Sequence, residues 1–529
     1  MPEDGKANMF CTVNTGGLRG LASYVAAVEV DVSRGLPGFE MVGLLGSEVK
    51  EARERIRVAL KNTQIELPAL RITVNISPAD IHKSGTGYDL PVALAIMTAW
   101  GILPAGCLHG IWVAGELGLQ GEVKPIKGVL PMVTEAQRVG IEECILPFEN
   151  LREGSVAVQL PVMGVRSLQE AAAYLAAPGE QREALRQQAI KEAATLSADV
   201  PVTEEYDMAM IRQMKEAKRA ALIAAAGFHN LLLMGPPGAG KTLLARCIPS
   251  ILPPLDFPEQ QEVSAIYSVA GKLPQGNLMI QRPFVAPHHT LSIHALAGGG
   301  SVPRPGMVSL AHRGILFLDE MAEFKRATLD ILRQPLEERR IYLAKSGGDF
   351  VYPADFMLVG ASNPCACGYY PDRNRCRCTH YEVHRYLSRV SGPLLDRIDL
   401  CAFMKAVPAG VLWETASIDR EAAWSSPAML ERVLQARGRQ KRRYAGTGIE
   451  LNSRLGASNT VRYCSLGLAQ QRYMERIAES MHLSARACHR ILRVARTIAD
   501  LDDSDRIEDI HLSEAVCYRS NELPGGEVR

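Results

Sequence analysis

The sequence predicts an α/β protein in which two α/β domains are followed by a small helical bundle. Short β-rich runs alternate with helical patterns over residues 10–175 and again over residues 206–405, which is typical of α/β domains. Beyond residue 410 strand signals become scarce and apolar residues recur at helical spacing. The chain has 529 residues, which is enough for several large hydrophobic cores.

The composition is that of a globular protein with balanced charge. Hydrophobic residues make up 47% of the chain, and 59 Lys and Arg against 58 Asp and Glu leave a net charge of +1. These values exclude disordered and fibrous proteins, and any basic surface has to be local. The first residues do not resemble a signal peptide, and twelve cysteines in so long a chain do not indicate a disulfide framework. We therefore expect a cytoplasmic protein without a membrane segment.

The first α/β domain is assigned to residues 1–178. An apolar stretch, Leu90–Gly106, is broken by prolines and too short to span a bilayer comfortably, so it predicts a buried helix. Residues 179–205 are rich in Gln, Glu, Arg, Ala and Ser, which predicts a helical or flexible linker. The β-rich runs that predict strands in this domain are Ala27–Val32, Arg71–Ile76, Ile111–Ala114 and Glu143–Leu146.

A glycine-rich loop in the second α/β domain, residues 206–408, is the strongest functional signal. The predicted strand Asn230–Met234 leads directly into this loop and a helical pattern follows it, which disfavours the alternative of a turn without a ligand. Such a loop curls its backbone amides around phosphates, so Lys241 is predicted to neutralise the β- and γ-phosphates of a nucleotide and Thr242 to bind Mg²⁺. The loop consists of Gly235, Pro236, Pro237, Gly238, Ala239, Gly240, Lys241 and Thr242.

Two further predicted strands end in polar side chains. Gly314–Leu318 is followed by Asp319, predicted to hold Mg²⁺ directly or through water, and by Glu320, predicted to orient or activate the attacking water. Alone, these acids would be better explained as caps of the next helix, but the phosphate loop favours a metal site. The strand Phe356–Gly360 leads to Asn363, which is predicted to contact the γ-phosphate or the lytic water; its alternative role is to form a turn before a proline.

Four of the twelve cysteines lie within fourteen positions of one another. The loop between the inner pair is long enough to bring four sulfurs to one tetrahedral ion, so the cluster predicts a structural zinc site, with His380 as a spare ligand. The alternative is four free thiols, because a reducing compartment disfavours disulfides. The four cysteines are Cys365, Cys367, Cys376 and Cys378.

The order of several motifs resembles that of a known family. The motifs are Gly235–Thr242, Phe317–Glu320, Ala361–Cys365, Ser391–Asp399, Gly35–Gly43, Val74–Asp80, Ala286–Thr290 and Ala495–Asp500. Together they are similar to the magnesium-chelatase-like AAA+ ATPases, and within these to the YifB/ComM group. The resemblance implies a central AAA+ P-loop core over residues 206–408, a C-terminal helical lid over residues 409–529, ATP and Mg²⁺ as cofactors, and a ring, expected to be a hexamer, with ATP between neighbouring subunits.

Arginines in two of the matching regions have roles that the resemblance implies. Arg397 matches the arginine finger that reaches the γ-phosphate of the adjoining subunit, and Arg389 competes for this role. The alternative for Arg397 is a salt bridge within the subunit to Asp396 or Asp399. Arg486 matches the second sensor of the helical lid; its alternative is an ordinary solvated helix residue.

The resemblance also implies that the ring acts on DNA. The segment Pro283–Gly306 matches an insertion that projects toward the ring's channel, and Arg339–Tyr352 predicts a hairpin around Ser346–Asp349. The matching hairpin of related helicases carries a basic residue, here Lys345, with Arg304 as a weaker DNA-binding candidate; the alternative is a solvated lysine. The expected function is a branch-migration helicase on single-stranded or branched DNA, in recombination or natural transformation.

Two other functions are the alternatives. Residues 70–150 resemble the proteolytic domain of Lon, which implies a Lon-protease-like α/β domain and raises a Ser-Lys protease. The stretch Gly85–Asp89 offers glycine where the Lon pattern has its serine, and Val129–Pro131 stands where it has its lysine. Ser84, Lys83 and Lys127 lie nearby at shifted positions, so we expect this fold without proteolysis, used for ring assembly or partner docking. The second alternative is a chelatase-type motor subunit that drives magnesium into a tetrapyrrole.

Overall fold

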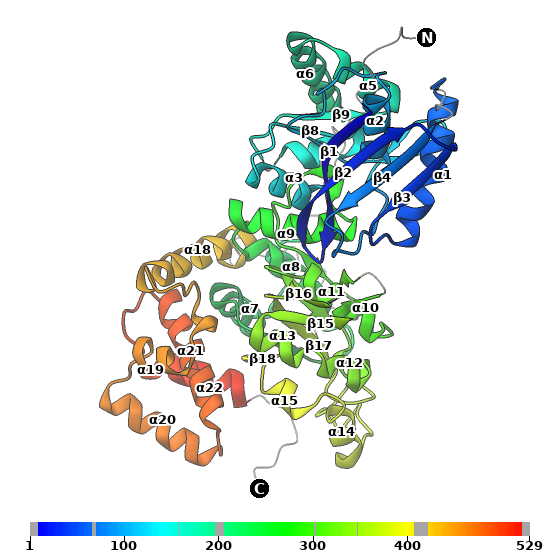
Figure 1. Cartoon of the computed structure of the whole chain (residues 1–529). Coiled ribbons are helices and arrows are strands. Elements are labelled where there is room, and N and C mark those ends of the chain that lie inside the picture. Colours follow the sequence, from blue (N-terminus) through cyan, green and yellow to red (C-terminus); the bar gives the residue numbers. More distant parts are fainter. Residues whose placement is uncertain are drawn as a thin grey trace.

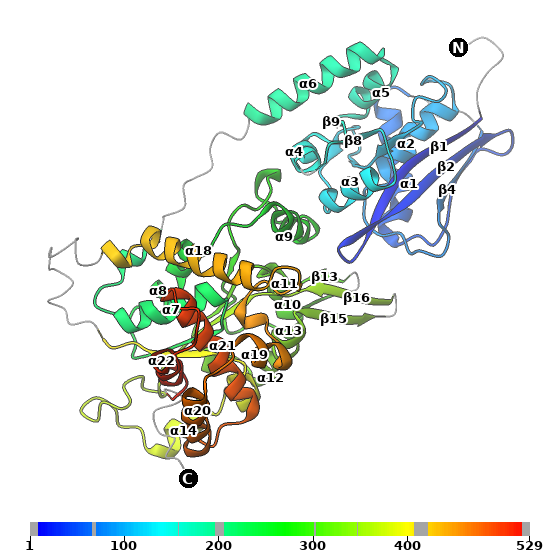
Figure 2. The ribbon, with the colours of Figure 1, turned by 90° about the vertical axis from the view of Figure 1, so that its left-hand side faces the viewer.

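A computed structural model describes residues 9–65, 70–156, 158–195, 206–300, 303–345, 348–406 and 422–520 of the protein. Figures 1 and 2 show an N-terminal α/β part, a central α/β part and a C-terminal group of helices, with α20 and α22 on the far side of the central part from the N-terminal one. No helix in these ranges is long and apolar enough to cross a membrane. The mixed α/β fold, its parallel sheet and its helical C-terminal region agree with the predicted class.

The N-terminal sheet has seven strands in the order β3-β4-β2-β1-β5-β8-β9. β1 pairs antiparallel with β2 and β2 with β4, whereas β5, β8 and β9 run parallel. Alternate residues of β2 are buried, as expected for a strand with one face on a core. All four predicted runs are strands, but β1, β3 and β9 were not predicted. The strands are β1 (Phe10–Arg19), β2 (Ala22–Ser33), β3 (Gly38–Val42), β4 (Arg71–Ser77), β5 (Ile111–Val113), β8 (Glu143–Pro147) and β9 (Val162–Val165).

The predicted buried helix of this part is α2 (Asp89–Ala99), whose residues are all buried, but it ends before Pro104. The start of the predicted linker is α6 (Gly179–Thr195), which packs Ala189 and Ala193 into the N-terminal core. The rest of that segment, residues 196–205, lies outside the described residues. The remaining elements are α1 (Ser47–Asn62), β6 (Glu116–Leu117), β7 (Val123–Lys124), α3 (Val129–Arg138), α4 (Leu151–Ser155) and α5 (Leu168–Ala176).

The central sheet has five parallel strands in the order β11-β14-β17-β10-β18. Parallel strands that are adjacent in a sheet present their carboxyl ends at one edge, where α/β proteins form their binding sites. β10, β14 and β17 are neighbours, so the three predicted polar strand ends lie at the same edge. The strands are β10 (Leu231–Met234), β11 (Phe284–Val285), β14 (Ile315–Leu318), β17 (Met357–Ser362) and β18 (Leu400–Phe403).

Helices and two short hairpins surround this sheet (Figure 1). β12 (Gly298–Gly299) pairs with β13 (Arg304–Pro305), and β15 (Arg340–Lys345) pairs with β16 (Gly348–Pro353), as the hairpin prediction required; its predicted turn residues 346–347 lie outside the described chain. The helices are α7 (Lys215–Gly227), α8 (Lys241–Cys247), α9 (Phe257–Ala270), α10 (Ile293–Ala297), α11 (Met307–Leu310), α12 (Arg326–Asp330), α13 (Arg333–Glu338), α14 (His380–Leu387) and α15 (Gly392–Leu395).

The C-terminal part is helical, as predicted. Helical spacing predicted four of its helices; the seven-residue α19 was missed, because it is too short to show a clear period. The expected boundary near residue 409 falls in residues 407–421, which lie outside the described chain. The helices are α18 (Ser426–Arg443), α19 (Ala457–Tyr463), α20 (Leu468–Ser480), α21 (Ala485–Leu501) and α22 (Asp509–Ser520).

Candidate functional site

The glycine-rich loop connects the end of β10 to the start of α8, as its sequence context predicted. Gly238 and Gly240 have φ angles of 76° and 81°, in the left-handed region that glycine adopts without strain. At Gly235 any side chain would collide with the carbonyl oxygen of Met404, just beyond β18. The loop can therefore curl tightly at the sheet edge only because these positions are glycines.

Lys241 is anchored beside the loop and beside Asn363. Its Nζ atom donates hydrogen bonds to the carbonyl oxygens of Gly235 and Pro236, at 2.7 and 2.9 Å, and to Oδ1 of Asn363, at 3.0 Å. Burial lowers the pKa of Lys241, while the charges of Asp319 and Glu320 oppose this shift. A half-buried ammonium group held by neutral oxygens is suited to bind an anionic ligand.

The two acids at the end of β14 lie against the start of α8. Thr242 donates from Oγ1 to Oδ2 of Asp319 at 2.8 Å, and Oδ1 of Asp319 accepts the backbone N–H of Glu320 at 2.9 Å. Glu320 is exposed and has a φ angle of 48°, a strained conformation for a non-glycine residue that is concentrated at functional sites. The hydroxyl and carboxylate oxygens of Thr242 and Asp319 are the hard donors that Mg²⁺ prefers.

The arginine-finger candidate Arg397 is paired within its own subunit. Its Nη2 lies 2.6 Å from Oε1 of Glu337 on α13, and its Nη1 donates to the carbonyl oxygen of Pro393 at 2.5 Å. The prediction that a salt bridge within the subunit would join Arg397 to Asp396 or Asp399 was therefore wrong about the partner. In the described chain, the carboxylate that binds Arg397 is that of Glu337. Sequence reasoning missed Glu337, because an acid in a polar helix carries no signal of its own.

Arg486 and Arg389 are also placed by contacts with acids. Arg486, the second residue of α21, is 74% exposed, and its Nη1 lies 3.7 Å from the same Oε1 atom of Glu337. Arg389 is 50% exposed and pairs with Glu323 at 2.9 Å. Within the described residues no hydrogen bond or ion pair links Arg397, Arg486 or Arg389 to the phosphate loop of the same subunit.

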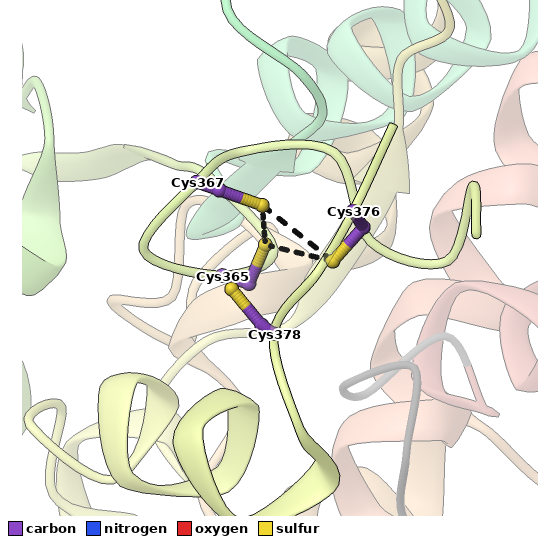
Figure 3. Close-up of side chains that lie close together, drawn as sticks. All are labelled: Cys365, Cys367, Cys376 and Cys378. Atoms are coloured by element: carbon purple, nitrogen blue, oxygen red, sulfur yellow. Dashed lines mark hydrogen bonds between the residues drawn. The ribbon is translucent and has the colours of Figure 1, made fainter. Parts of the chain in front are cut away.

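The four predicted cysteines come together in one cluster, shown in Figure 3. Their sulfur atoms all lie within 4.8 Å of one another, and each cysteine is a free thiol. The separation of Sγ atoms is 3.3 Å between Cys365 and Cys367, 3.5 Å between Cys367 and Cys376, and 3.8 Å between Cys365 and Cys376. The spare ligand His380 does not join them, because its Nε2 lies 3.0 Å from Nη2 of Arg373.

The predicted DNA-binding residues lie on the two small hairpins of the central part. Lys345 is the last residue of β15 and faces Gly348 across the hairpin, and Arg304 is an exposed residue of β13. The two hairpins lie side by side in Figure 2, and Tyr352 on β16 donates from its hydroxyl to the carbonyl oxygen of Pro303 at 2.8 Å. This hydrogen bond joins the two hairpins into one surface.

The residues near the Lon serine and lysine positions line a cavity of about 820 Å³. Ser84 and Lys127 both face it, together with Arg304 and Phe350 from the central part. Lys83 is buried instead, and its Nζ donates to the carbonyl oxygen of Pro78. Among the described residues, Ser84 and Lys127 make no hydrogen bond to each other.

Comparison with known proteins places the whole chain in one family. Residues 207–412 match the family model "Magnesium chelatase, subunit ChlI", residues 28–150 match "Subunit ChlI of Mg-chelatase", and residues 423–519 match "Magnesium chelatase, subunit ChlI C-terminal". The uncharacterized protein YifB of Salmonella typhimurium is 41% identical over 508 residues, covering 96% of each chain.

Two further relatives are informative. The competence protein ComM of Haemophilus influenzae is 39% identical over 501 residues, covering 95% of this chain and 96% of its own. Lon protease of Mycolicibacterium smegmatis is 28% identical over 158 residues, which is 28% of this chain and 20% of its own. YifB and ComM are 41% and 39% identical to this chain over nearly its full length, which shows that the chain belongs to the magnesium-chelatase-like YifB/ComM family.

Proposed function

We propose that the protein is an Mg²⁺-dependent ATPase that works as a ring-shaped AAA+ motor on DNA. The observation that carries the ATPase is the meeting of three strand ends at one sheet edge. There Lys241 contacts Asn363 at 3.0 Å, and Thr242 contacts Asp319 at 2.8 Å. Family membership supports an AAA+-type motor as well. The phosphate loop, an Mg²⁺ donor pair and a polar sensor are the parts that phosphoryl transfer requires.

Each residue of the site has a distinct task in this proposal. The backbone amides of residues 235–242 hold the phosphates of ATP, and Lys241 neutralises the β- and γ-phosphates. Thr242 and Asp319 hold Mg²⁺, which supplies charge neutralisation when bound. Glu320 orients the attacking water, and Asn363 contacts the γ-phosphate or that water.

The second proposal is that a complete site needs a neighbouring subunit in a hexamer. In the described chain, Arg397 and Arg486 contact Glu337 rather than the phosphate loop of their own subunit. Two guanidinium groups held by one half-exposed carboxylate are suited to reach a γ-phosphate across a subunit boundary. Arg389 remains the competing finger, paired with Glu323.

DNA is the proposed partner of the motor. The exposed residue Arg304 and the strand-end residue Lys345 lie on the two joined hairpins, where cations would grip phosphates without reading sequence. One relative is a competence protein, and competence concerns the uptake of DNA. We therefore favour branch migration during recombination or natural transformation, in the cytoplasm where ATP is available.

We propose that the N-terminal domain, residues 1–178, has a Lon-protease-like fold without proteolysis and serves in ring assembly or partner docking. A linker over residues 179–205, an AAA+ core over residues 206–408 and a lid over residues 409–529 complete the proposed organisation. A chelatase-type motor is the second candidate function, favoured by the three matching models, which are all named for a magnesium-chelatase subunit. Stimulation of ATP turnover by DNA, compared with stimulation by chelatase partner subunits, distinguishes the two.

The ATPase is tested by two substitutions with different expected defects. Lys241→Ala should abolish nucleotide binding, whereas Glu320→Gln should retain binding and lose hydrolysis, because only the water-orienting carboxylate is removed. Lys272→Ala and Glu338→Gln, at exposed positions of the same domain, are the matched controls. Turnover like that of the wild type in both site variants would refute this active site.

The DNA role is tested by comparing substrates. Four-way or forked DNA should raise ATP turnover above the level reached with single strands, and Lys345→Ala should reduce that stimulation by weakening the phosphate grip. Lys325→Ala, an exposed lysine away from the hairpins, is the control. If Lys345→Ala left both DNA-stimulated turnover and strand movement unchanged, the hairpin would have no part in binding DNA.

A further inference from the structure

We propose that Cys365, Cys367, Cys376 and Cys378 bind one zinc ion, and that this ion holds Asn363 in position beside Lys241. The first half of the proposal concerns metal binding alone. The second half rests on the proposed ATPase. The metal ligands and Asn363 are joined by the chain itself, because Cys365 follows Asn363 by two residues at the end of β17.

The sulfur geometry fits one tetrahedral ion. Zinc–thiolate bonds of about 2.3 Å place the sulfurs of a tetrahedron about 3.8 Å apart. The three measured Sγ separations are 3.3, 3.5 and 3.8 Å, and the fourth sulfur, on Cys378, also lies within 4.8 Å of the others. Figure 3 shows the four side chains converging from both arms of one loop. A four-sulfur set without histidine is a closed site of the structural kind.

The loop around the cluster supplies the interactions that a metal thiolate centre needs. The backbone N–H of Tyr370 donates to Sγ of Cys365 at 3.4 Å, a contact that orients a ligand and offsets its charge. Four thiolates around Zn²⁺ carry a net charge of −2, and the same loop carries two arginines of opposite charge. Arg373 donates to the carbonyl oxygen of Cys378 at 3.0 Å, and the guanidinium of Arg375 lies 4.0 Å from the ring centre of Tyr369.

The same loop touches the phosphate loop directly. At Gly368, which has a φ angle of 86°, an added Cβ would lie 2.5 Å from Cδ of Pro237. The loop that carries the four cysteines therefore contacts the phosphate loop at Gly368. Asn363, two residues before Cys365, contacts it as well, because it accepts the hydrogen bond from Lys241. A loop cross-linked by an ion between these two contacts has less freedom to move Asn363 away. Asn363 is the residue that acts on the nucleotide, and the cysteines are positioning residues.

Metal content tests the first half of the proposal. Full-length protein purified without added metal should contain one zinc per chain, and Cys376→Ser should lose it. Cys401→Ser is the matched control, because Cys401 and Cys376 are buried to a similar degree (4% and 3% exposed) and only Cys376 belongs to the cluster. Exchange with Co²⁺ should give the intense d–d absorption of tetrahedral thiolate coordination in the control and not in Cys376→Ser. Protein without stoichiometric metal, or with iron in place of zinc, overturns the assignment.

Steady-state kinetics test the second half. Cys376→Ser should lower kcat by about tenfold or more, the usual cost of disturbing an outer shell, and change KM for ATP by less than about threefold. Adding Cys376→Ser to Asn363→Ala should lower kcat little further, because both changes remove the same positioned amide. A full additional loss in the double variant, or an unchanged kcat in a zinc-free protein, refutes the positioning role and leaves the zinc result standing.

A second route guards against a folding defect in Cys376→Ser. Zinc is removed from wild-type protein with a chelator and then restored, and kcat should fall and recover with the measured zinc content. Cys367→Ser, which changes the exposed ligand, should show the same loss in kcat. If kcat is independent of zinc content in the wild-type protein, the ion does not position Asn363. If turnover like that of the wild type in Lys241→Ala and Glu320→Gln refuted the proposed ATPase, the zinc stoichiometry would still stand.

Discussion

A single carboxylate, that of Glu337, joins the two arginines most relevant to a trans-acting role. Its Oε1 atom lies 2.6 Å from Arg397 and 3.7 Å from Arg486, and the glutamate side chain is 46% exposed. The exposed pair with Arg486 contributes little to stability, whereas the side chain of Arg397 is only 12% exposed. The contact with Glu337 therefore serves to hold the two guanidinium groups at a defined place. A phosphate that competes with the carboxylate can then bind them.

The first prediction concerns that carboxylate. Glu337→Gln should lower the free energy of unfolding by about 1 kcal/mol or less, because the glutamate is 46% exposed and the amide oxygen of glutamine can still accept a hydrogen bond from Arg397. It should nevertheless alter ATP turnover in the assembled ring, since both arginines lose their common anchor. Chemical denaturation and steady-state turnover measure the two effects, with Glu338→Gln on the same helix as the control. A stability loss of several kcal/mol would show that Glu337 is structural.

The second prediction concerns Asp319, the proposed Mg²⁺ ligand at the end of β14. Asp319→Asn should raise the Mg²⁺ concentration needed for half-maximal ATP turnover, because an amide is a weaker ligand than a carboxylate for a hard cation. The hydrogen bond from Thr242 can still form to the amide oxygen, so the fold should persist. Titration of turnover with Mg²⁺ measures the shift, and Asp80→Asn, an exposed acid of the N-terminal domain, is the control. An unchanged Mg²⁺ requirement would remove Asp319 from the metal site.

At the scale of elements, part of the basic helix α18 packs against the rest of the fold. Six basic residues lie between Arg432 and Arg443, and of these Lys441 and Arg442 are exposed. Arg437 instead donates to the carbonyl oxygen of Ala225 at 2.7 Å, and Arg439 pairs with Asp505 at 3.2 Å. Half of the basic residues therefore connect elements of the fold rather than face solvent.

The junction of α18 and α21 is organised by a buried acid. Asp500 is fully buried, pairs with Arg443, lies 3.2 Å from Arg496, and accepts a hydrogen bond from Asn452 at 2.9 Å. A buried charge with this many donors is satisfied, whereas its removal leaves two arginines without their partner. This network fixes α21, the helix on which Arg486 lies, against α18.

The third prediction compares a buried and an exposed acid of the same region. Asp500→Ala should lower the free energy of unfolding by about 3–5 kcal/mol, because it leaves buried arginines uncompensated. Asp503→Ala, which removes a 92% exposed partner of Arg439, should cost less than about 1 kcal/mol. Chemical denaturation followed by circular dichroism measures both. Equal losses of stability in the two variants would contradict the conclusion that burial decides how much each acid contributes to the stability of these helices.

At the scale of the whole molecule, the central part links the other two. Its α9 meets the N-terminal domain, where Gly128 donates its N–H to the carbonyl oxygen of Ser268 at 3.1 Å and Ser268 hydrogen-bonds the buried Glu153. On the lid side, Arg219 of α7 pairs with Glu514 of α22 at 2.9 Å. Movement at the proposed nucleotide site therefore has direct contacts through which to reach both neighbours.

The fourth prediction tests sharing of the site between subunits. Lys241→Ala and Arg397→Ala should each be inactive alone, yet a mixture should form sites with Lys241 from one subunit and Arg397 from the next. Random equal mixing in a closed ring gives about a quarter of sites with both groups intact, and turnover should recover toward that level. The mixture is assayed after co-expression or subunit exchange. No recovery would exclude Arg397 as the finger, and the same experiment with Arg389→Ala then tests its competitor.

The sequence by itself determined the features whose chemistry is local. The strand, glycine-rich loop and helix around Lys241 follow one another within a short stretch, and the four cysteines are separated by short intervals, so spacing alone predicted both. Strands and long helices were also predictable, because side-chain period reports which face is buried. The short α19 carried too few residues for a period, and β1, β3 and β9 were not predicted.

Only the tertiary structure decided which distant residues meet. The strand order places β17 between β10 and β14, and this brings Asn363 to Lys241 although 122 positions separate them. The contact of Gly368 with Pro237, and the choice of Glu337 rather than Asp396 or Asp399 as the partner of Arg397, depend on packing in the same way. Propensity and spacing act over a few residues, whereas these contacts are set by the burial of whole strands and helices against one another.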